Sequence, residues 1–137
     1  MRFIASILAI AAVAAEDTCS KGDLSLMGGD VFSEFVWYCT QTAFIQDSYI
    51  SECLETGCNM TRRCASCFDD YGRCARGCLN ECFVTPSGDS CATCMTKLGC
   101  TEALYTCTGL TEPLPSPTKL SPVCSATGPS LLRRTPA

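Results

Sequence analysis

Cysteine is the feature of this chain that most constrains its fold: 14 of the 137 residues are cysteine, and five of them lie in the stretch CASCFDDYGRCARGCLNEC, residues 64–82. A short secreted chain in which more than about 8–10% of residues are cysteine is typical of a disulfide scaffold. The count is even, so every thiol can find a partner. We therefore interpret the cysteines as staples of the fold and expect seven disulfides.

The N-terminus has the layout of a secretory signal peptide. A basic Arg2 precedes an apolar run over residues 3–15, and the small Val13 and Ala15 stand just before a polar, acidic pair. The run is too short to cross a bilayer comfortably as a helix. The sequence thus predicts cleavage after about Ala15, a secreted extracellular protein and no transmembrane span.

Charge and composition exclude several classes of function. Beyond residue 15 the chain carries nine basic and 14 acidic residues, with no basic run longer than two, so nucleic acid is a poor partner. The chain contains no histidine, which excludes Ser-His-Asp and Cys-His catalysis and any zinc site built on imidazole. We expect a protein that is not an enzyme and that holds no cofactor.

The spacing of apolar residues predicts an all-α, disulfide-rich domain over residues 16–108. After an irregular lead-in, three helices are expected at about 31–56, 61–83 and 90–108. Two breaks are open alternatives: Asp47-Ser48 can divide the first helix, although we favour one continuous helix, and Gly99 can interrupt the third. Residues 109–137 are rich in Pro, Ser and Thr and are expected to form an extended tail pinned by Cys124.

The five cysteines of the middle helix project within a stripe about 80° wide on a helical wheel. In an antiparallel helix pair, residues at the same height have residue numbers with a constant sum. This rule predicts five bridges: Cys53–Cys64, Cys39–Cys78, Cys82–Cys91, Cys74–Cys100 and Cys67–Cys107. The remaining Cys19, Cys58, Cys94 and Cys124 would pair among themselves.

Two alternatives to this scheme stay open. Cys78 with Cys94 satisfies the same rule and competes with Cys39–Cys78. The two CxxC motifs, which begin at Cys64 and Cys91, have the spacing of a structural zinc site, but the signal peptide favours disulfides over metal ligation.

Aromatic side chains crowd the first predicted helix. Phe35, Trp37, Tyr38 and Phe44 extend round it beyond a narrow buried stripe, and they are candidates for a partner surface or a lipid-binding groove; burial against other helices is the alternative. Asn59 begins the triplet Asn-Met-Thr and is a candidate N-glycosylation site in an expected turn. The tail carries a dibasic pair, residues 133–134, which is a candidate site for trimming.

These features predict a secreted, non-enzymatic binding module: an effector, an inhibitor, a toxin-like ligand or a surface component. Its partner would be an extracellular protein of unknown identity. The alternative is a carrier of a lipid or another hydrophobic ligand, held by the aromatic residues of the first helix. A zinc-binding structural protein is a third, weaker interpretation.

Overall fold

A computed structural model describes residues 18–46 and 48–124 of the chain. The described part is helical, with seven α-helices, one 3₁₀ turn and no strand. The elements are α1 (Lys21–Met27), α2 (Phe32–Gln46), α3 (Ile50–Cys58), α4 (Arg62–Ala75), η1 (Arg76–Cys78), α5 (Leu79–Cys82), α6 (Asp89–Lys97) and α7 (Cys100–Thr108). The all-α, disulfide-rich fold class is confirmed, whereas the predicted signal peptide lies outside the described residues.

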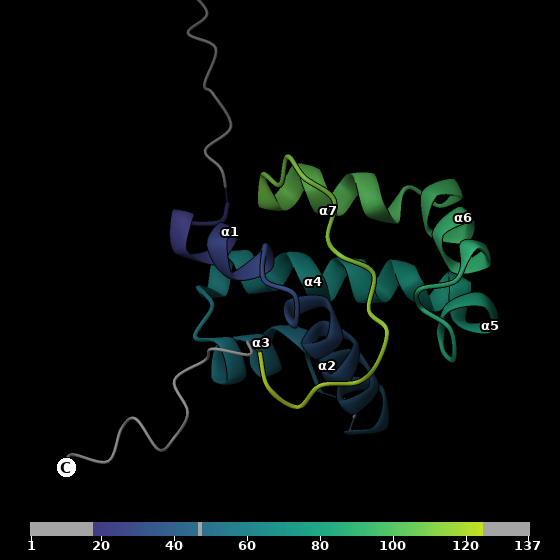
Figure 1. The fold of residues 1–137 in the computed structure, drawn as a ribbon, viewed down its shortest axis with the longest axis horizontal. Coiled ribbons are helices and arrows are strands. Elements are labelled where there is room, and N and C mark those ends of the chain that lie inside the picture. The colour runs from purple at the N-terminus through teal and green to yellow at the C-terminus, as the bar shows by residue number, and fades with distance from the viewer. Residues whose placement is uncertain (1–17, 47, 125–137) are drawn as a thin grey trace, which may run out of the picture.

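Helix α4 is the centre of the molecule. It packs against α3 on one side and α7 on the other, and α2 in turn packs against α3 (Figure 1). Its continuation through η1 into α5 follows the predicted middle helix closely. The third predicted helix is interrupted at Gly99, whose φ of 73° requires the left-handed conformation that glycine tolerates best.

The predicted single helix over residues 31–56 is wrong. Helix α2 ends at Gln46 and α3 begins at Ile50. The N-cap residue of α3 makes no side-chain capping bond; instead Asp69, on α4, accepts a hydrogen bond of 2.9 Å from the Ser51 amide. A carboxylate at that place satisfies an amide that the start of a helix leaves without an intrahelical partner. The restart of the helix is therefore stabilised by a tertiary contact.

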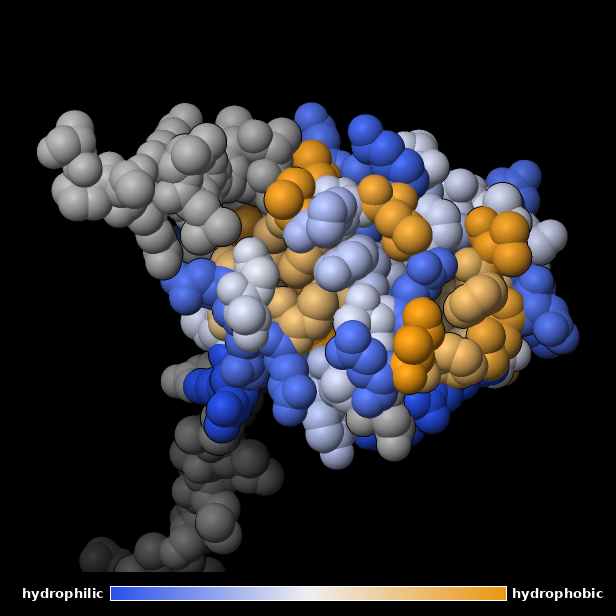
Figure 2. All heavy atoms as spheres, turned by 90° about the horizontal axis from the view of Figure 1, so that it is seen from below, coloured by the Kyte–Doolittle hydropathy of each residue, from blue (hydrophilic) through white to orange (hydrophobic). Residues whose placement is uncertain are grey.

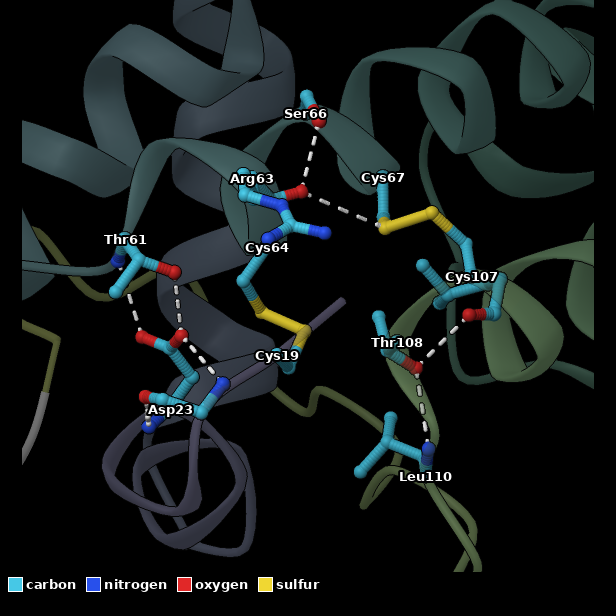
Figure 3. The surroundings of a disulfide bond; sticks show 12 residues. Cys19, Asp23, Thr61, Arg63, Cys64, Ser66, Cys67, Cys107, Thr108 and Leu110 are labelled. Carbon is cyan, nitrogen blue, oxygen red and sulfur yellow. Dashed lines mark hydrogen bonds between the residues drawn. A yellow bond between two sulfur atoms is a disulfide. The ribbon is translucent and has the colours of Figure 1, made fainter. Parts of the chain in front are cut away.

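The lead-in is not wholly irregular, because it contains helix α1. Ser20 and Asp23 form a reciprocal capping box at its start, and Met27 at its end is fully buried. Asp23 also accepts hydrogen bonds from the Thr61 amide at 3.0 Å and from the Thr61 hydroxyl at 2.6 Å, which ties α1 to the start of α4 (Figure 3). Beside this contact, Cys19 is bonded to Cys64.

All 14 cysteines are in disulfides. The seven bonds are Cys19–Cys64, Cys39–Cys53, Cys58–Cys124, Cys67–Cys107, Cys74–Cys100, Cys78–Cys94 and Cys82–Cys91. The structure contains the predicted pairs between the middle helix and the helices that follow it: Cys67–Cys107, Cys74–Cys100 and Cys82–Cys91. These pairs exist because α4 and α5 run beside α7 and α6 as the rule assumed.

The pairs predicted between the first and middle helices, Cys53–Cys64 and Cys39–Cys78, do not occur. The turn after α2 brings Cys39 to Cys53, with their Cα atoms 5.6 Å apart, so neither is left for the middle helix. Cys64 is bonded to Cys19 instead, and Cys78 takes the competing partner Cys94. The expectation that Cys19, Cys58, Cys94 and Cys124 pair among themselves thus holds only for Cys58–Cys124.

Residues 109–124, hereafter the strap, contain no regular secondary structure. The strap leaves α7, passes α2 and reaches α3 (Figure 1), where Cys124 is bonded to Cys58. Midway, the Thr118 hydroxyl donates to Glu34 Oε1 at 3.1 Å, and the Ser121 amide donates to the Glu34 carbonyl at 3.4 Å. The strap is therefore fixed at its end by a disulfide and held to α2 by two hydrogen bonds to Glu34.

Candidate functional site

The four aromatic residues singled out in the sequence do not form one surface. Phe35 is buried, stacks on Tyr38 with ring centroids 5.8 Å apart, and packs where a side chain on Gly57 would overlap its ring. Trp37 and Phe44 instead line a groove. Phe35 and Tyr38 therefore pack against each other, whereas Trp37 and Phe44 form part of a concave surface.

The groove has a volume of about 580 Å³ and lies between α2 and the run from α4 to α5. Helices α6 and α7 and residues 114–117 of the strap complete its walls. Much of the lining is apolar and comes from every one of these walls: Val36, Trp37, Ala43, Phe44, Ile50, Leu79, Phe83, Met95, Leu104 and Leu114. A concave, largely apolar site of this size is suited to a small hydrophobic ligand.

One end of the groove is open and apolar. Phe44 on α2 and Phe83, just after α5, face each other with ring centroids 6.1 Å apart, and both side chains are exposed. Figure 2 views the molecule from the side of α2 and α3 and shows apolar atoms gathered at the end near α5. An exposed pair of aromatic rings at the mouth of an apolar groove is unusual for a surface that meets only water.

Two tyrosines supply polar groups within the apolar lining. Burial, and to a smaller extent the neighbouring Tyr105, raises the pKa of the Tyr71 phenol, which stays neutral at physiological pH. The Tyr105 hydroxyl accepts a hydrogen bond of 3.3 Å from the Leu114 amide and so holds the start of the strap against the groove. Ser33 also lines the groove, and its Oγ is the only buried side-chain polar atom of the described residues without a hydrogen-bond partner.

Three charged residues line the groove, all from the side of α4: Asp69, Arg73 and Arg76. Asp69 is engaged by the Ser51 amide. Arg73 pairs with Asp70 at 3.0 Å in a contact that is exposed on both sides. Arg76 forms no ion pair within residues 18–46 and 48–124. The sequence alone did not indicate that either arginine belongs to a site. The one available signal was helical spacing, since Arg73, Arg76 and Leu79 follow one another at intervals of three residues.

Of the other sequence-predicted positions, Cys82 and Cys91 line the groove as a disulfide, and Asn59 does not line it. Asn59 is exposed in the turn between α3 and α4 and adopts the left-handed conformation, with φ of 54°. The four cysteines of the CxxC motifs are all bonded to other cysteines, and a disulfide sulfur is not the thiolate that binds zinc.

No family model, curated protein or solved structure matches this chain. Within residues 18–46 and 48–124, none of the helices has the length and apolar character needed to cross a membrane. The seven disulfides fit an oxidising, extracellular environment.

Proposed function

We propose that this protein is a secreted carrier that binds a small hydrophobic ligand in the groove between α2 and the run from α4 to α5. The observation that carries the proposal is the groove itself, about 580 Å³ in volume, with apolar side chains on each wall. Removing apolar surface from water contributes about 25 cal/mol per Å². A hydrophobic ligand therefore gains binding affinity from burial in such a groove alone. The N-terminal apolar run and the disulfides support secretion.

The groove favours a carrier over the module for a protein partner that the sequence first suggested. Of the four aromatic residues proposed as a partner surface, Phe35 is buried and Trp37 faces the groove. Protein partners of stable complexes engage broad surfaces rather than a concave site of this kind. Disulfides that cross-link the surrounding helices would keep the groove open in the absence of ligand, which lowers the ordering cost of binding.

The chain offers its own reporter for this proposal. Trp37 is the only tryptophan in the sequence and lines the groove. A neutral apolar dye, N-phenyl-1-naphthylamine, absorbs where tryptophan emits, so its binding in the groove should quench Trp37 emission and raise dye fluorescence in a saturable manner. We expect this titration to give a single site per chain in the oxidised protein.

Two neighbouring residues provide a matched pair of variants. Phe44 lines the groove, whereas Ile45 is 79% exposed and does not line it. Phe44 is half exposed, so its ring is expected to make only part of its possible contact with the dye. Phe44→Ala should therefore weaken dye binding about fivefold. Ile45→Ala should leave affinity unchanged. Unquenched Trp37 emission at saturating dye, or equal effects of the two substitutions, would refute the carrier proposal.

A further inference from the structure

We infer that the ligand of the groove is an anionic amphiphile: a single apolar chain whose negatively charged head group is held by Arg76, with Arg73 beside it. This inference rests on the proposed carrier function and specifies its ligand class. Three features of the groove support it: the positive charge on one wall, the weak pairing of that charge within the protein, and the shape of the groove.

The charge of the lining differs in sign from that of the whole protein. The chain has a net charge of −4, yet the charged groups that line the groove are two arginines and one aspartate. The aspartate, Asp69, already accepts the Ser51 amide at the start of α3. In an acidic protein, a pair of guanidinium groups at the edge of an apolar groove is a local attraction for an anion.

The two arginines are arranged to act together. Arg73 and Arg76 are three residues apart on the helical run, so their side chains are neighbours, and both line the groove. Arg76 forms no ion pair with the described residues, and the partner of Arg73 is an exposed Asp70. An exposed i, i+3 pair contributes little to stability, and an incoming anion can displace it at small cost. A guanidinium also offers the forked geometry that a carboxylate accepts in two hydrogen bonds.

The shape of the groove suits one extended chain. On α2 the lining runs from Ser33 to Phe44, roughly 16 Å along the helix axis at 1.5 Å per residue. The strap lies along the same space, and its residues Leu114 and Pro117 are part of the wall. A long, apolar channel with its positive groups on one wall is complementary to an alkyl chain that ends in a carboxylate or another anion.

The test compares two ligands that differ only in the head group. Lauric acid and lauryl alcohol would each be titrated, below the concentrations at which they aggregate, against the oxidised protein loaded with N-phenyl-1-naphthylamine. We expect the acid to displace the dye with about tenfold higher affinity than the alcohol, as a charge-assisted hydrogen bond provides. Added salt should reduce this preference, because screening acts on the acid alone.

Variants locate the head group. Arg76→Gln should weaken binding of the acid about fivefold and leave the alcohol within about twofold of wild type, and the double variant with Arg73→Gln should abolish the preference. Arg62→Gln is the control: Arg62 is also an exposed arginine, paired at 3.5 Å with Glu55, and it does not line the groove. It should leave both affinities unchanged.

The outcomes separate this inference from the carrier proposal. If the dye and the alcohol bind but the acid binds no better, or if Arg76→Gln weakens both ligands equally, the carrier stands and the anionic head group is wrong. If neither the dye nor either ligand binds, both proposals fail. Acid affinity that is the same in wild type and in the double arginine variant also overturns the inference.

Discussion

The two ends of the molecule are held together by different means. The larger buried cluster, hereafter the main core, joins α1, α2, α3, α4, α7 and the end of the strap, and Phe32 and Phe68 are fully buried in it. The smaller cluster, hereafter the sulfur-rich end, consists of four buried residues, Cys78, Cys91, Met95 and Cys100, of which three are cysteines. The main core combines large apolar side chains with four disulfides, whereas the sulfur-rich end has three disulfides and few apolar side chains.

This difference follows from what each end can bury. A fully buried phenylalanine or leucine contributes about 1.5–3 kcal/mol through removal of its surface from water. The short helices α5 and α6 offer few such residues, and Leu79 and Leu98 stay partly exposed. Cys74–Cys100, Cys78–Cys94 and Cys82–Cys91 fasten this end instead. Since the groove takes its walls from both ends, its shape depends on both kinds of support.

The largest effect of a single substitution is expected in the main core. Phe68 is fully buried and packs edge-on against Phe32 with ring centroids 5.7 Å apart. Phe68→Ala should lower the free energy of unfolding by about 3–5 kcal/mol, through lost transfer energy and the cavity left behind. Met95→Ala, in the sulfur-rich end, should cost about 2 kcal/mol, the low end of its range, because few apolar side chains surround it. Denaturant titration of the oxidised variants measures both values, and equal losses would contradict the contrast.

Two disulfides of similar loop length allow a sharper comparison. Cys39–Cys53 closes a loop of 14 residues in the main core, and Cys78–Cys94 closes one of 16 residues in the sulfur-rich end. Removing either pair as a double Cys→Ala variant should cost about 3 kcal/mol by loop-closure entropy. The two variants should differ in which helix opens locally. Amides of α6 should lose hydrogen-exchange protection only in the Cys78–Cys94 variant. Full protection of α6 in that variant would show that its apolar contacts suffice.

The sequence predicted the disulfides well where local helix geometry decides them. Cys67 and Cys107 meet because α4 and α7 run antiparallel, and the periodicity of each helix indicates which residues face each other. The rule failed for Cys39 because it assumed one helix from residue 31 to 56. A break at Asp47-Ser48 was the alternative that the sequence left open, and the restart at α3 is stabilised by Asp69 of α4, a contact that no local pattern in the chain contains.

The groove was also predictable only in part, because several of its walls are brought together by tertiary contacts. Trp37 and Phe44 stood out as aromatic residues in excess of a buried stripe, and they do line the groove. Arg76 and Leu114 are equally part of the lining. Arg76 lies on the run from α4 to α5 and Leu114 lies on the strap, and only the tertiary fold places these two segments beside α2.

A smaller effect tests how the N-terminal helix is attached to the main core. Burial opposes ionisation of Asp23, but hydrogen bonds from Thr61 and Ser20 outweigh it and lower the pKa of this carboxyl below its usual value. A lowered folded-state pKa stabilises the protein above the unfolded pKa, near 3.9, and this contribution is lost as the pH falls through the folded value. Asp23→Asn should therefore cost about 1–2 kcal/mol at pH 7 and progressively less in acid.

The measurement for Asp23 is the free energy of unfolding of both proteins from pH 7 to pH 2. Asn has nearly the same shape and volume as Asp, so the substitution removes the charge without leaving a cavity. A difference between Asp23→Asn and wild type that does not shrink in acid would contradict the assignment.

Two glycines on the same helical run offer the finest test, since the same substitution should have opposite signs. A Cβ on Gly72 would press into the Cδ1 atom of Ile50, a side chain that is buried in the main core. A Cβ on Gly77 would meet only the Cδ1 atom of Leu98, at 2.8 Å, at the end of a half-exposed side chain that can turn away. Alanine is favoured over glycine in a helix by about 1 kcal/mol, whereas overpacking a core costs about 1–3 kcal/mol. Gly77→Ala should thus raise the free energy of unfolding by up to about 1 kcal/mol, and Gly72→Ala should lower it by about 1 kcal/mol. Thermal unfolding of the two oxidised variants measures both effects. If both substitutions stabilise the protein, α3 packs on α4 loosely enough to accept an added methyl group, and the contrast between the two ends is weakened.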